Sequence, residues 1–392
     1  MRSMTVAERR ARLAVRHRLA AAARIDDAAE ISRSMVALHA TDPATVYLSV
    51  SARSRSLTPA DVERALYEDR SLLRLLAMRR TMFVAPVETV PVLQAAVADA
   101  LALKQRRTYG GYIAQAIEGD VAGWLHEVAE ETHAELLRRG AATGAQLSAA
   151  VPRLRLQVDT APGKSYSKPT NITTWVLLIL GVEGRIVRGR PKGSWTSSQY
   201  TWAPIETWLP EGMSPPPVEH ARAELARNWL RAFGPAPVAD LKWWSGWSLG
   251  EVRKALARLD IAEVDLDGVA AVALADDLEP TPAPEPWAAL LPALDPTPMG
   301  WQSRQWFLGP HERELFDTNG NVGPTIWWDG RVVGGWAQRA DGEITWEFLE
   351  DVGADARAAV AAEAQRVTEW FGSVRAIPRF RTPLERKLTV RE

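Results

Sequence analysis

The chain has 392 residues and a formal net charge of −1, with 46% hydrophobic and 24% charged residues. These values are typical of a folded protein of two or three domains, and the charge alone does not indicate a nucleic-acid partner. Cys is absent and only six His are present, which excludes disulfides and cysteine-ligated metal centres and predicts an activity without metal or cofactor. No apolar run reaches the roughly 18 residues of a membrane span, and no secretory signal is present, so we expect a cytoplasmic protein without a membrane partner.

The first quarter of the chain predicts helices followed by a β-ribbon. Asp26 or Asp27 is a suitable N-cap for one helix, and Thr58 followed by Pro59 marks the start of another. A β-ribbon after a set of helices is the order of a winged helix, which we assign to residues 1–110. The predicted helices span 5–24, 26–38, 47–50 and 58–66, and the predicted strands span 72–76 and 79–84.

The same order recurs twice along the chain. In each case the helices precede a segment that alternates like a β-hairpin. We therefore assign a second unit to residues 111–214 and a third to residues 215–280, with Pro215-Pro216-Pro217 as the linker between them. The predicted helices are 121–139, 143–150 and 170–180, then 218–232, 238–244 and 248–259, and the predicted hairpins are 184–196 and 261–274.

The last quarter, residues 281–392, has a different character. Asp329-Gly330 and Asp341-Gly342 are hairpin turn signals between short strands, and one helix and a polar tail follow. We predict an α+β protein with three tandem winged-helix units and a C-terminal antiparallel β-rich domain. The strands are predicted at 306–308, 325–328, 331–336 and 343–348, and the helix at 354–371.

Positive charge is concentrated in the second unit, where residues 152–192 contain eight basic and two acidic side chains. Cations on a hairpin can neutralise DNA phosphates, and Trp195 can stack at a base step. The alternative is a solvated hairpin with Trp195 packed locally. The DNA-binding residues expected from this hairpin are Arg185, Arg188, Arg190, Lys192 and Trp195.

Two further pairs of cations stand just before predicted elements. Lys164 and Lys168 precede the helix at 170–180, where they either hold a phosphate at its N-terminus or belong to a flexible polar loop. Arg79 and Arg80 precede a strand of the first unit, where they contact a phosphate or form a surface ion pair. We add all four to the expected DNA-binding residues.

The segment from Leu38 to Pro43 combines His39, Thr41 and Asp42 at the end of a predicted helix. Histidine is the side chain whose unperturbed pKa lies near neutrality, and neighbouring hydrogen-bonding groups can bind a single ligand. The alternative is that Thr41 and Asp42 only form a turn and that His39 is a satisfied helix-end histidine. An irregular loop later in the chain contains Asp295, which we expect to form a turn rather than to orient a catalytic group.

The chain resembles the bacterial winged-helix DNA glycosylase family, of the AlkZ/YcaQ kind, over nearly its full length. The resemblance rests on the three tandem units, on Arg79-Arg80-Thr81-Met82-Phe83-Val84, on residues 239–246 and on the β-rich region from 291 to 334. In that family a polar–apolar–polar motif carries catalysis, usually Gln-x-Gln, with His-x-Gln and Gln-x-Asp forms. Here the motif falls on His39-Ala40-Thr41.

The resemblance implies a C-shaped DNA-binding architecture and an enzyme with His39 and Thr41 as catalytic residues. We add Asp42 to the expected catalytic residues, where it either contributes negative charge or only caps the turn. The implied reaction is hydrolysis of the N-glycosidic bond of N7-alkylated purines in duplex DNA, present as bulky adducts or interstrand crosslinks. The implied enzyme is monofunctional, monomeric, nucleoid-associated and independent of metal, and it acts in base excision repair or in self-resistance to a genotoxin. The alternative is a non-catalytic winged-helix DNA-binding protein or transcriptional regulator.

Overall fold

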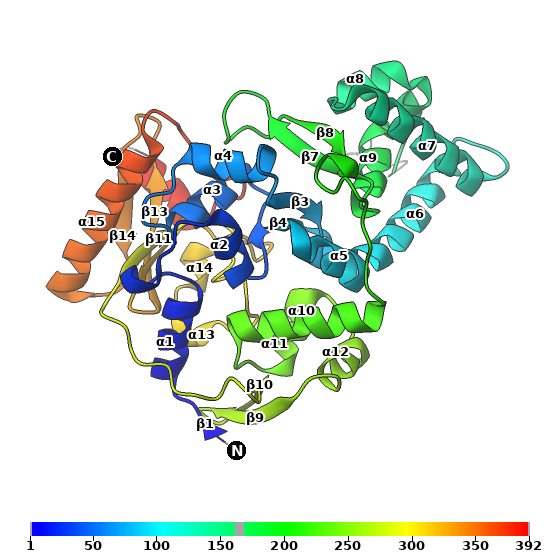
Figure 1. The fold of residues 1–392 in the computed structure, drawn as a ribbon. Coiled ribbons are helices and arrows are strands. Elements are labelled where there is room, and N and C mark those ends of the chain that lie inside the picture. The colour runs from blue at the N-terminus through cyan, green and yellow to red at the C-terminus, as the bar shows by residue number, and fades with distance from the viewer. Residues whose placement is uncertain (1, 161–167, 391–392) are drawn as a thin grey trace.

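The computed structural model describes residues 2–160 and 168–390 and contains helices and small, mostly antiparallel sheets (Figure 1). The α+β class predicted from the sequence is therefore confirmed. The sheets contain two to four strands each. Because such small sheets bury little surface by themselves, the helices that pack on them supply much of the core.

In the first quarter, short helices pack around a three-stranded sheet of order β2-β4-β3. Asp27 accepts hydrogen bonds from the first turn of the second helix, and Thr58 and Asp61 form a capping box on the fourth. The helices are α1 (Val6–Arg16), α2 (Ala28–Ser34), α3 (Pro43–Ser51) and α4 (Pro59–Tyr67), and the strands are β2 (Leu38–His39), β3 (Leu72–Leu76) and β4 (Met82–Pro86).

Two predictions for this quarter are wrong in detail. The helix expected over residues 5–24 ends at Arg16, because Arg18 has a φ of 57°, which a right-handed helix does not accommodate. Residues 38–39 were expected at a helix end but form strand β2, which pairs with β4. Val36, with a φ of 67°, turns the chain out of α2 before β2 begins. His39 therefore lies on a sheet edge.

The second quarter forms a helical lobe with its own hydrophobic core, which includes Leu125, Ile179 and Trp202. In Figure 1, α6 to α9 form this lobe at the upper right. A π-helical turn, Gln94–Ala98, joins α5 to α6, and neither helix was predicted. The elements are α5 (Val90–Leu93), α6 (Asp99–Ile113), α7 (Val121–Arg139), α8 (Gly144–Ala150), β5 (Gln157–Val158), β6 (Thr170–Asn171), α9 (Thr173–Val182), β7 (Ile186–Pro191) and β8 (Tyr200–Pro204).

The β7–β8 hairpin connects this lobe to the rest of the molecule. Ile186 and Trp202 belong to the core of the lobe, whereas their neighbours Val187 and Ala203 belong to the main core. This alternation follows from the two-residue period of a strand, which sends successive side chains to opposite faces. Both faces of the hairpin are thus partly buried.

The third quarter contains the predicted helices and a β-hairpin. Ser248 and Glu251 form the predicted capping box, and Gly246, with a φ of 76°, ends the helix before it. The first strand of the chain, β1 (Arg2–Ser3), pairs in parallel with the hairpin. The elements are α10 (Val218–Phe233), α11 (Val238–Ser245), α12 (Leu249–Leu256), β9 (Ile261–Leu266) and β10 (Val269–Leu274).

The last quarter is a four-stranded antiparallel sheet with helices around it. Residues 306–308 were predicted as a strand but lie in a short helix, and the predicted polar tail contains a helix whose Leu384 and Leu388 are buried. The elements are β11 (Ala288–Leu291), α13 (Gln305–Leu308), α14 (Glu312–Leu315), β12 (Thr325–Trp328), β13 (Arg331–Gln338), β14 (Ile344–Phe348), α15 (Gly353–Phe371) and α16 (Pro383–Thr389).

One large hydrophobic core joins the first, third and last quarters of the chain, with Leu38, Trp229 and Trp327 among its fully buried members. Segments far apart in the sequence therefore support one another, and β2 sits against this shared core. Within residues 2–160 and 168–390, no helix has both the length and the apolar character required to cross a membrane.

Candidate active site

The strand β2 places His39 at the edge of the first sheet. His39 is paired with Phe83 of β4, and the two rings meet edge-on with their centroids 5.4 Å apart. The side chain of His39 is only 6% exposed. Packing against Phe83 and burial together limit the positions that the imidazole can take.

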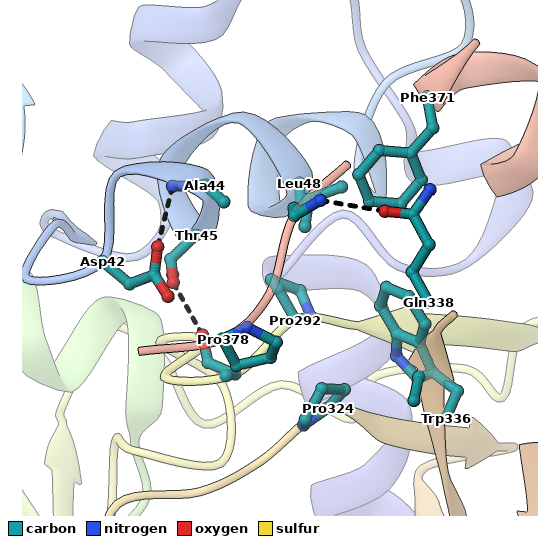
Figure 2. A pocket seen from close by; sticks show the side chains of 13 residues that line it. Asp42, Ala44, Thr45, Leu48, Pro292, Pro324, Trp336, Gln338, Phe371 and Pro378 are labelled. Carbon is teal, nitrogen blue, oxygen red and sulfur yellow. Dashed lines mark hydrogen bonds between the residues drawn. The ribbon is translucent and has the colours of Figure 1, made fainter. Parts of the chain in front are cut away.

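Thr41 and Asp42 follow β2 and lead directly into α3. Thr41 is partly exposed, whereas Asp42 is buried. The Asp42 carboxylate caps α3 by accepting a hydrogen bond of 3.0 Å from the Ala44 N–H, as Figure 2 shows, and Pro43 begins the helix. The other carboxylate oxygen accepts a hydrogen bond of 2.8 Å from the backbone N–H of Arg379. Asp42 therefore ties the motif to the C-terminal segment.

The protonation states follow from burial. Burial, then the positive charge of Arg79, lowers the pKa of His39 to about 3, while Asp295 opposes the shift. His39 is therefore neutral near pH 7. Burial raises the pKa of Asp42, and its hydrogen bonds from Arg379 and Ala44 act in the opposite direction.

A buried ion pair is hydrogen-bonded to α3. Arg53 and Asp295 are both fully buried and form two hydrogen bonds of 2.6 and 2.8 Å. Ser49 of α3 donates to the same carboxylate at 2.8 Å, and the backbone N–H of Thr297 donates to it at 2.9 Å. Asp295 is thus more than the turn former expected from the sequence, since it links α3 to the C-terminal quarter.

The same network reaches His17, which is fully buried. Its Nδ1 lies 2.9 Å from the Thr297 hydroxyl, and its Nε2 lies 3.1 Å from the carbonyl oxygen of Ala232 in α10. Burial, followed by the nearby charge of Arg53, lowers the pKa of His17 to about 3. One hydrogen-bonded cluster therefore joins four chain segments, which are those around His17, Arg53, Ala232 and Asp295.

Arg79 and Arg80 lie at the tip of the β3–β4 hairpin, and both are exposed. Their φ angles are 52° and 60°, in the left-handed region that favours Gly. The Arg79 guanidinium lies 4.0 Å from the ring centre of Trp243 in α11, and Arg304 lies 5.1 Å from the same ring. Arg79 is also close enough to lower the pKa of His39.

The cations expected on the basic hairpin have varied surroundings. Arg185 pairs with Glu130, and Arg190 pairs with Glu68 at 3.0 Å and with Glu63 at 3.8 Å. Lys192 is exposed. These arginines hold the hairpin to neighbouring helices in the structure, and their contact with DNA stays a prediction.

The other residues expected to bind DNA also differ in their surroundings. Arg188 lies over the ring of Tyr200, 4.2 Å from its centre. Trp195 is 6% exposed and stacks on Tyr47, with ring centres 4.9 Å apart. Trp195 therefore packs inside the protein, as in the second of the two interpretations of the sequence, and its ring is not an open surface for stacking. Lys168 is exposed, and Lys164 lies outside the described residues.

A recess of about 350 Å³, including its open mouth, lies beside Asp42 (Figure 2). Its wall is mostly apolar, with Leu48, Trp336 and Phe371 facing Asp42 across it. His39 and Thr41 do not line it. The recess therefore neighbours the motif without containing it.

The described part of the chain brings together no group of three or more His, Asp or Glu side chains arranged to hold a metal ion. The functional surroundings that the sequence did not indicate are Arg53, Arg74 and Arg379. Arg74 is flanked by leucines, and Arg53 and Arg379 each begin a short Arg-x-Arg segment, so no local pattern relates the three residues to the motif.

The geometry can be compared with known proteins. A family model described as DNA glycosylase AlkZ-like matches residues 32–370. The chain is similar in structure to the Streptomyces sahachiroi DNA glycosylase AlkZ, with a TM-score of 0.72 and 20% sequence identity over 95% of this chain and 98% of that chain. No curated protein gave a significant match. The structural likeness establishes the fold, and the family model spans most of the sequence, including the motif. The chain therefore belongs to the AlkZ-like family of DNA glycosylases.

Proposed function

We propose that this glycosylase hydrolyses the N-glycosidic bond of N7-alkylated purines in duplex DNA. The observation that carries the proposal is the neutral, buried His39 beside Thr41 at the motif position. A purine alkylated at N7 is already cationic, so its base leaves without being protonated. The enzyme has to orient water and stabilise an oxocarbenium-like sugar, for which neutral hydrogen-bonding groups are suitable.

His39 is assigned to the attacking water. With a pKa of about 3, the neutral ring keeps a lone pair that accepts a hydrogen bond from water. Its Nδ1 lies 3.5 Å from the Thr41 N–H, at the outer limit of a hydrogen bond, so the backbone orients the ring only weakly and does not fix its tautomer. The Thr41 hydroxyl holds the same water from its more exposed position.

Asp42 is assigned a positioning role. Both of its carboxylate oxygens accept backbone hydrogen bonds, from Ala44 and Arg379, and this fixes the turn that presents Thr41. A carboxylate in this place also favours the positive charge that develops on the sugar. The recess beside Asp42 does not have to hold the whole base, because a bulky adduct can be cleaved without full base flipping.

Water rather than an amine is proposed as the nucleophile, which makes the enzyme monofunctional, and we propose that no metal ion activates this water. A Schiff-base mechanism requires a lysine, and among the residues that the structure describes no lysine forms a hydrogen bond or an ion pair with His39 or Asp42. Three tandem winged-helix units in a C-shaped monomer complete the proposal. Such a shape leaves the motif open to bulky adducts and interstrand crosslinks, in base excision repair or in self-resistance.

The test is release of base from duplex DNA that carries a single N7-methylguanine or a nitrogen-mustard crosslink. The wild type is expected to release the base and to leave an abasic strand without borohydride-trapped protein. His39→Ala is expected to lower the rate by about 100-fold or more, the usual contribution of a positioned acid–base group.

Lys242→Ala is the matched control, since Lys242 is exposed on α11 and has no assigned role. Its rate should equal that of the wild type. Tight binding of the same duplex without release of base would instead show a non-catalytic DNA-binding protein or regulator.

A further inference from the structure

Arg74 is a buried cation whose charge is not paired. It lies in β3, its side chain is 4% exposed, and its Nε and Nη2 atoms are buried with no hydrogen-bond partner among the described residues. Burying an unpaired charge costs several kcal/mol by general estimates, and buried polar atoms in folded proteins are normally satisfied. An unpaired guanidinium at this depth therefore indicates a ligand.

Two more arginines approach the same place from distant segments. Arg188 comes from β7 of the basic hairpin and has a buried Nε without a partner among the described residues, and Arg379 comes from the segment before α16. Burial is the main cause that lowers the pKa of Arg188, and Arg74 and Arg379 are close enough to lower it further. Strands β3 and β7 pack against each other, and this contact brings Arg74 of β3 near Arg188 of β7.

The negative charge near the cluster is small. Asp42 is the carboxylate on which Arg379 and Arg74 act electrostatically, but its oxygens accept hydrogen bonds from the backbone N–H groups of Ala44 and Arg379. Glu63, which is also close, pairs with Arg190. Within the described ranges, none of the three arginines forms an ion pair, so the cluster retains an excess of positive charge beside the motif.

We propose that Arg74, Arg188 and Arg379 form a site for one backbone phosphate of the DNA strand that carries the alkylated base. Guanidinium groups present planar N–H donors that match phosphate oxygens, and they keep their charge when buried. The site adjoins Asp42, two residues after Ala40 of the motif, so a phosphate held there sets the register of the damaged nucleotide against His39 and Thr41. This inference rests on the proposed action on DNA.

The test combines variants with single neutral linkages in the DNA. A methylphosphonate is moved one position at a time along the damaged strand, and binding is measured at several salt concentrations. For the wild type, one position near the lesion should weaken binding by about ten-fold or more, the usual size of a charged hydrogen bond. Arg379→Gln and Arg74→Gln should be insensitive to that position, and each should lower the slope of log K against log salt by about 1.

Arg379→Gln keeps the backbone N–H that binds Asp42 and changes an exposed side chain, so it provides the test if Arg74→Gln does not fold. Arg74→Lys, which retains a charge without the planar fork, should fall between the wild type and Arg74→Gln. Arg357→Gln on α15 is the control, because Arg357 is exposed, pairs with Asp351 and has no assigned role. It should keep the wild-type response.

Two results would overturn the assignment. One is that no single linkage distinguishes the wild type from Arg379→Gln. The other is that inorganic phosphate raises the melting temperature of the wild type but not of Arg379→Gln while the linkage scan is flat, which would show a site for a small anion. Both measurements use binding alone, so they remain informative if no base is released and the proposed function fails.

Discussion

The paired arginines of the basic hairpin and the arginine cluster beside the motif, which includes Arg188 of the same hairpin, differ in the state of their charges. On the hairpin, Arg185 and Arg190 pair with acidic side chains of neighbouring helices. Beside the motif, Arg74 and Arg379 pair with none of the described residues, although Arg74 is far more deeply buried. The number of cations in a segment therefore indicates less about ligand binding than whether the fold has already neutralised them.

The difference has a physical basis. A partly exposed arginine that pairs with a glutamate gains little stability and loses little on separation, so these pairs mainly set the position of the hairpin. A buried guanidinium has already lost its hydration and gains most from an anion that arrives with the substrate. Four measurements test this contrast.

The largest effect is expected for the buried pair of Arg53 and Asp295. Asp295→Ala leaves the Arg53 guanidinium buried without its carboxylate, and the free energy of unfolding should fall by about 3–5 kcal/mol. Denaturant unfolding measures the change. Replacing both residues with apolar ones, Arg53→Met with Asp295→Leu, should restore part of the loss. If the free energy of unfolding fell by less than about 1 kcal/mol, as expected for an exposed ion pair, burial would not distinguish this ion pair from the exposed pairs of the hairpin.

Acid should destabilise the protein through its buried histidines. His17 and His39 have a pKa of about 3 in the fold, whereas an unfolded histidine titrates near 6.5, so below that pH the unfolded state binds more protons. Each histidine should therefore lower the free energy of unfolding by about 1.4 kcal/mol per pH unit between pH 6.5 and pH 3. The stability that the two neutral histidines provide is fully present above pH 6.5 and is lost as the pH falls below that value.

Unfolding followed between pH 7 and pH 5 measures this slope. His39→Gln should remove the share of one histidine from this slope. An identical slope in wild type and His39→Gln would contradict the neutral state assigned to His39. Base release, in contrast, should not fall between pH 8 and pH 5 through protonation of His39.

An effect of intermediate size is expected at the tip of the β3–β4 hairpin, where one substitution should raise stability and weaken DNA binding. Arg80 has a φ of 60° and is exposed, so Arg80→Gly should relieve backbone strain and stabilise the fold by up to about 1 kcal/mol. Loss of the cation should weaken duplex binding a few-fold and lower its salt dependence. Thermal unfolding and binding at two salt concentrations check this, and a gain in stability with unchanged binding would remove Arg80 from the interface.

The smallest effect is expected for the paired cations of the hairpin. Arg190→Gln removes a charge that Glu63 and Glu68 already neutralise, so stability should change by less than about 1 kcal/mol. Duplex binding should weaken less than in Arg379→Gln. Titration of one labelled duplex against both variants compares them directly. A larger loss in Arg190→Gln would mean that DNA displaces the glutamates and that the hairpin is the main binding surface.

Much of the local structure could be predicted from the sequence because it depends on neighbouring residues. The capping boxes at Thr58 and Ser248 and the helix Val121–Arg139 follow from short-range rules. The family could be predicted because its motif and strand segments are contiguous. The position of His39 could not, since a two-residue strand depends on its pairing with β4 and not on its own periodicity.

The surroundings of the motif were out of reach for the same reason. Arg53 and Asp295 are 242 positions apart. Arg74, Arg188 and Arg379 come from three different regions of the chain, its first, second and last quarters. No spacing rule joins such residues. The packing role of Trp195 also depends on Tyr47 and α15, which the sequence around the hairpin does not reveal.

The pairing of β1 with β9 has a consequence for how the chain folds. Arg2 aligns with Val264, and the N–H of Met4 donates to the carbonyl oxygen of Asp265 at 2.8 Å. During synthesis β1 must therefore wait for β9, which lies 262 positions further along the chain, before the two strands can pair. Such long-range closure slows folding, and until it occurs β9 has an unpaired edge that invites association with other chains. Removing β1 should thus affect solubility during synthesis before it affects the finished site.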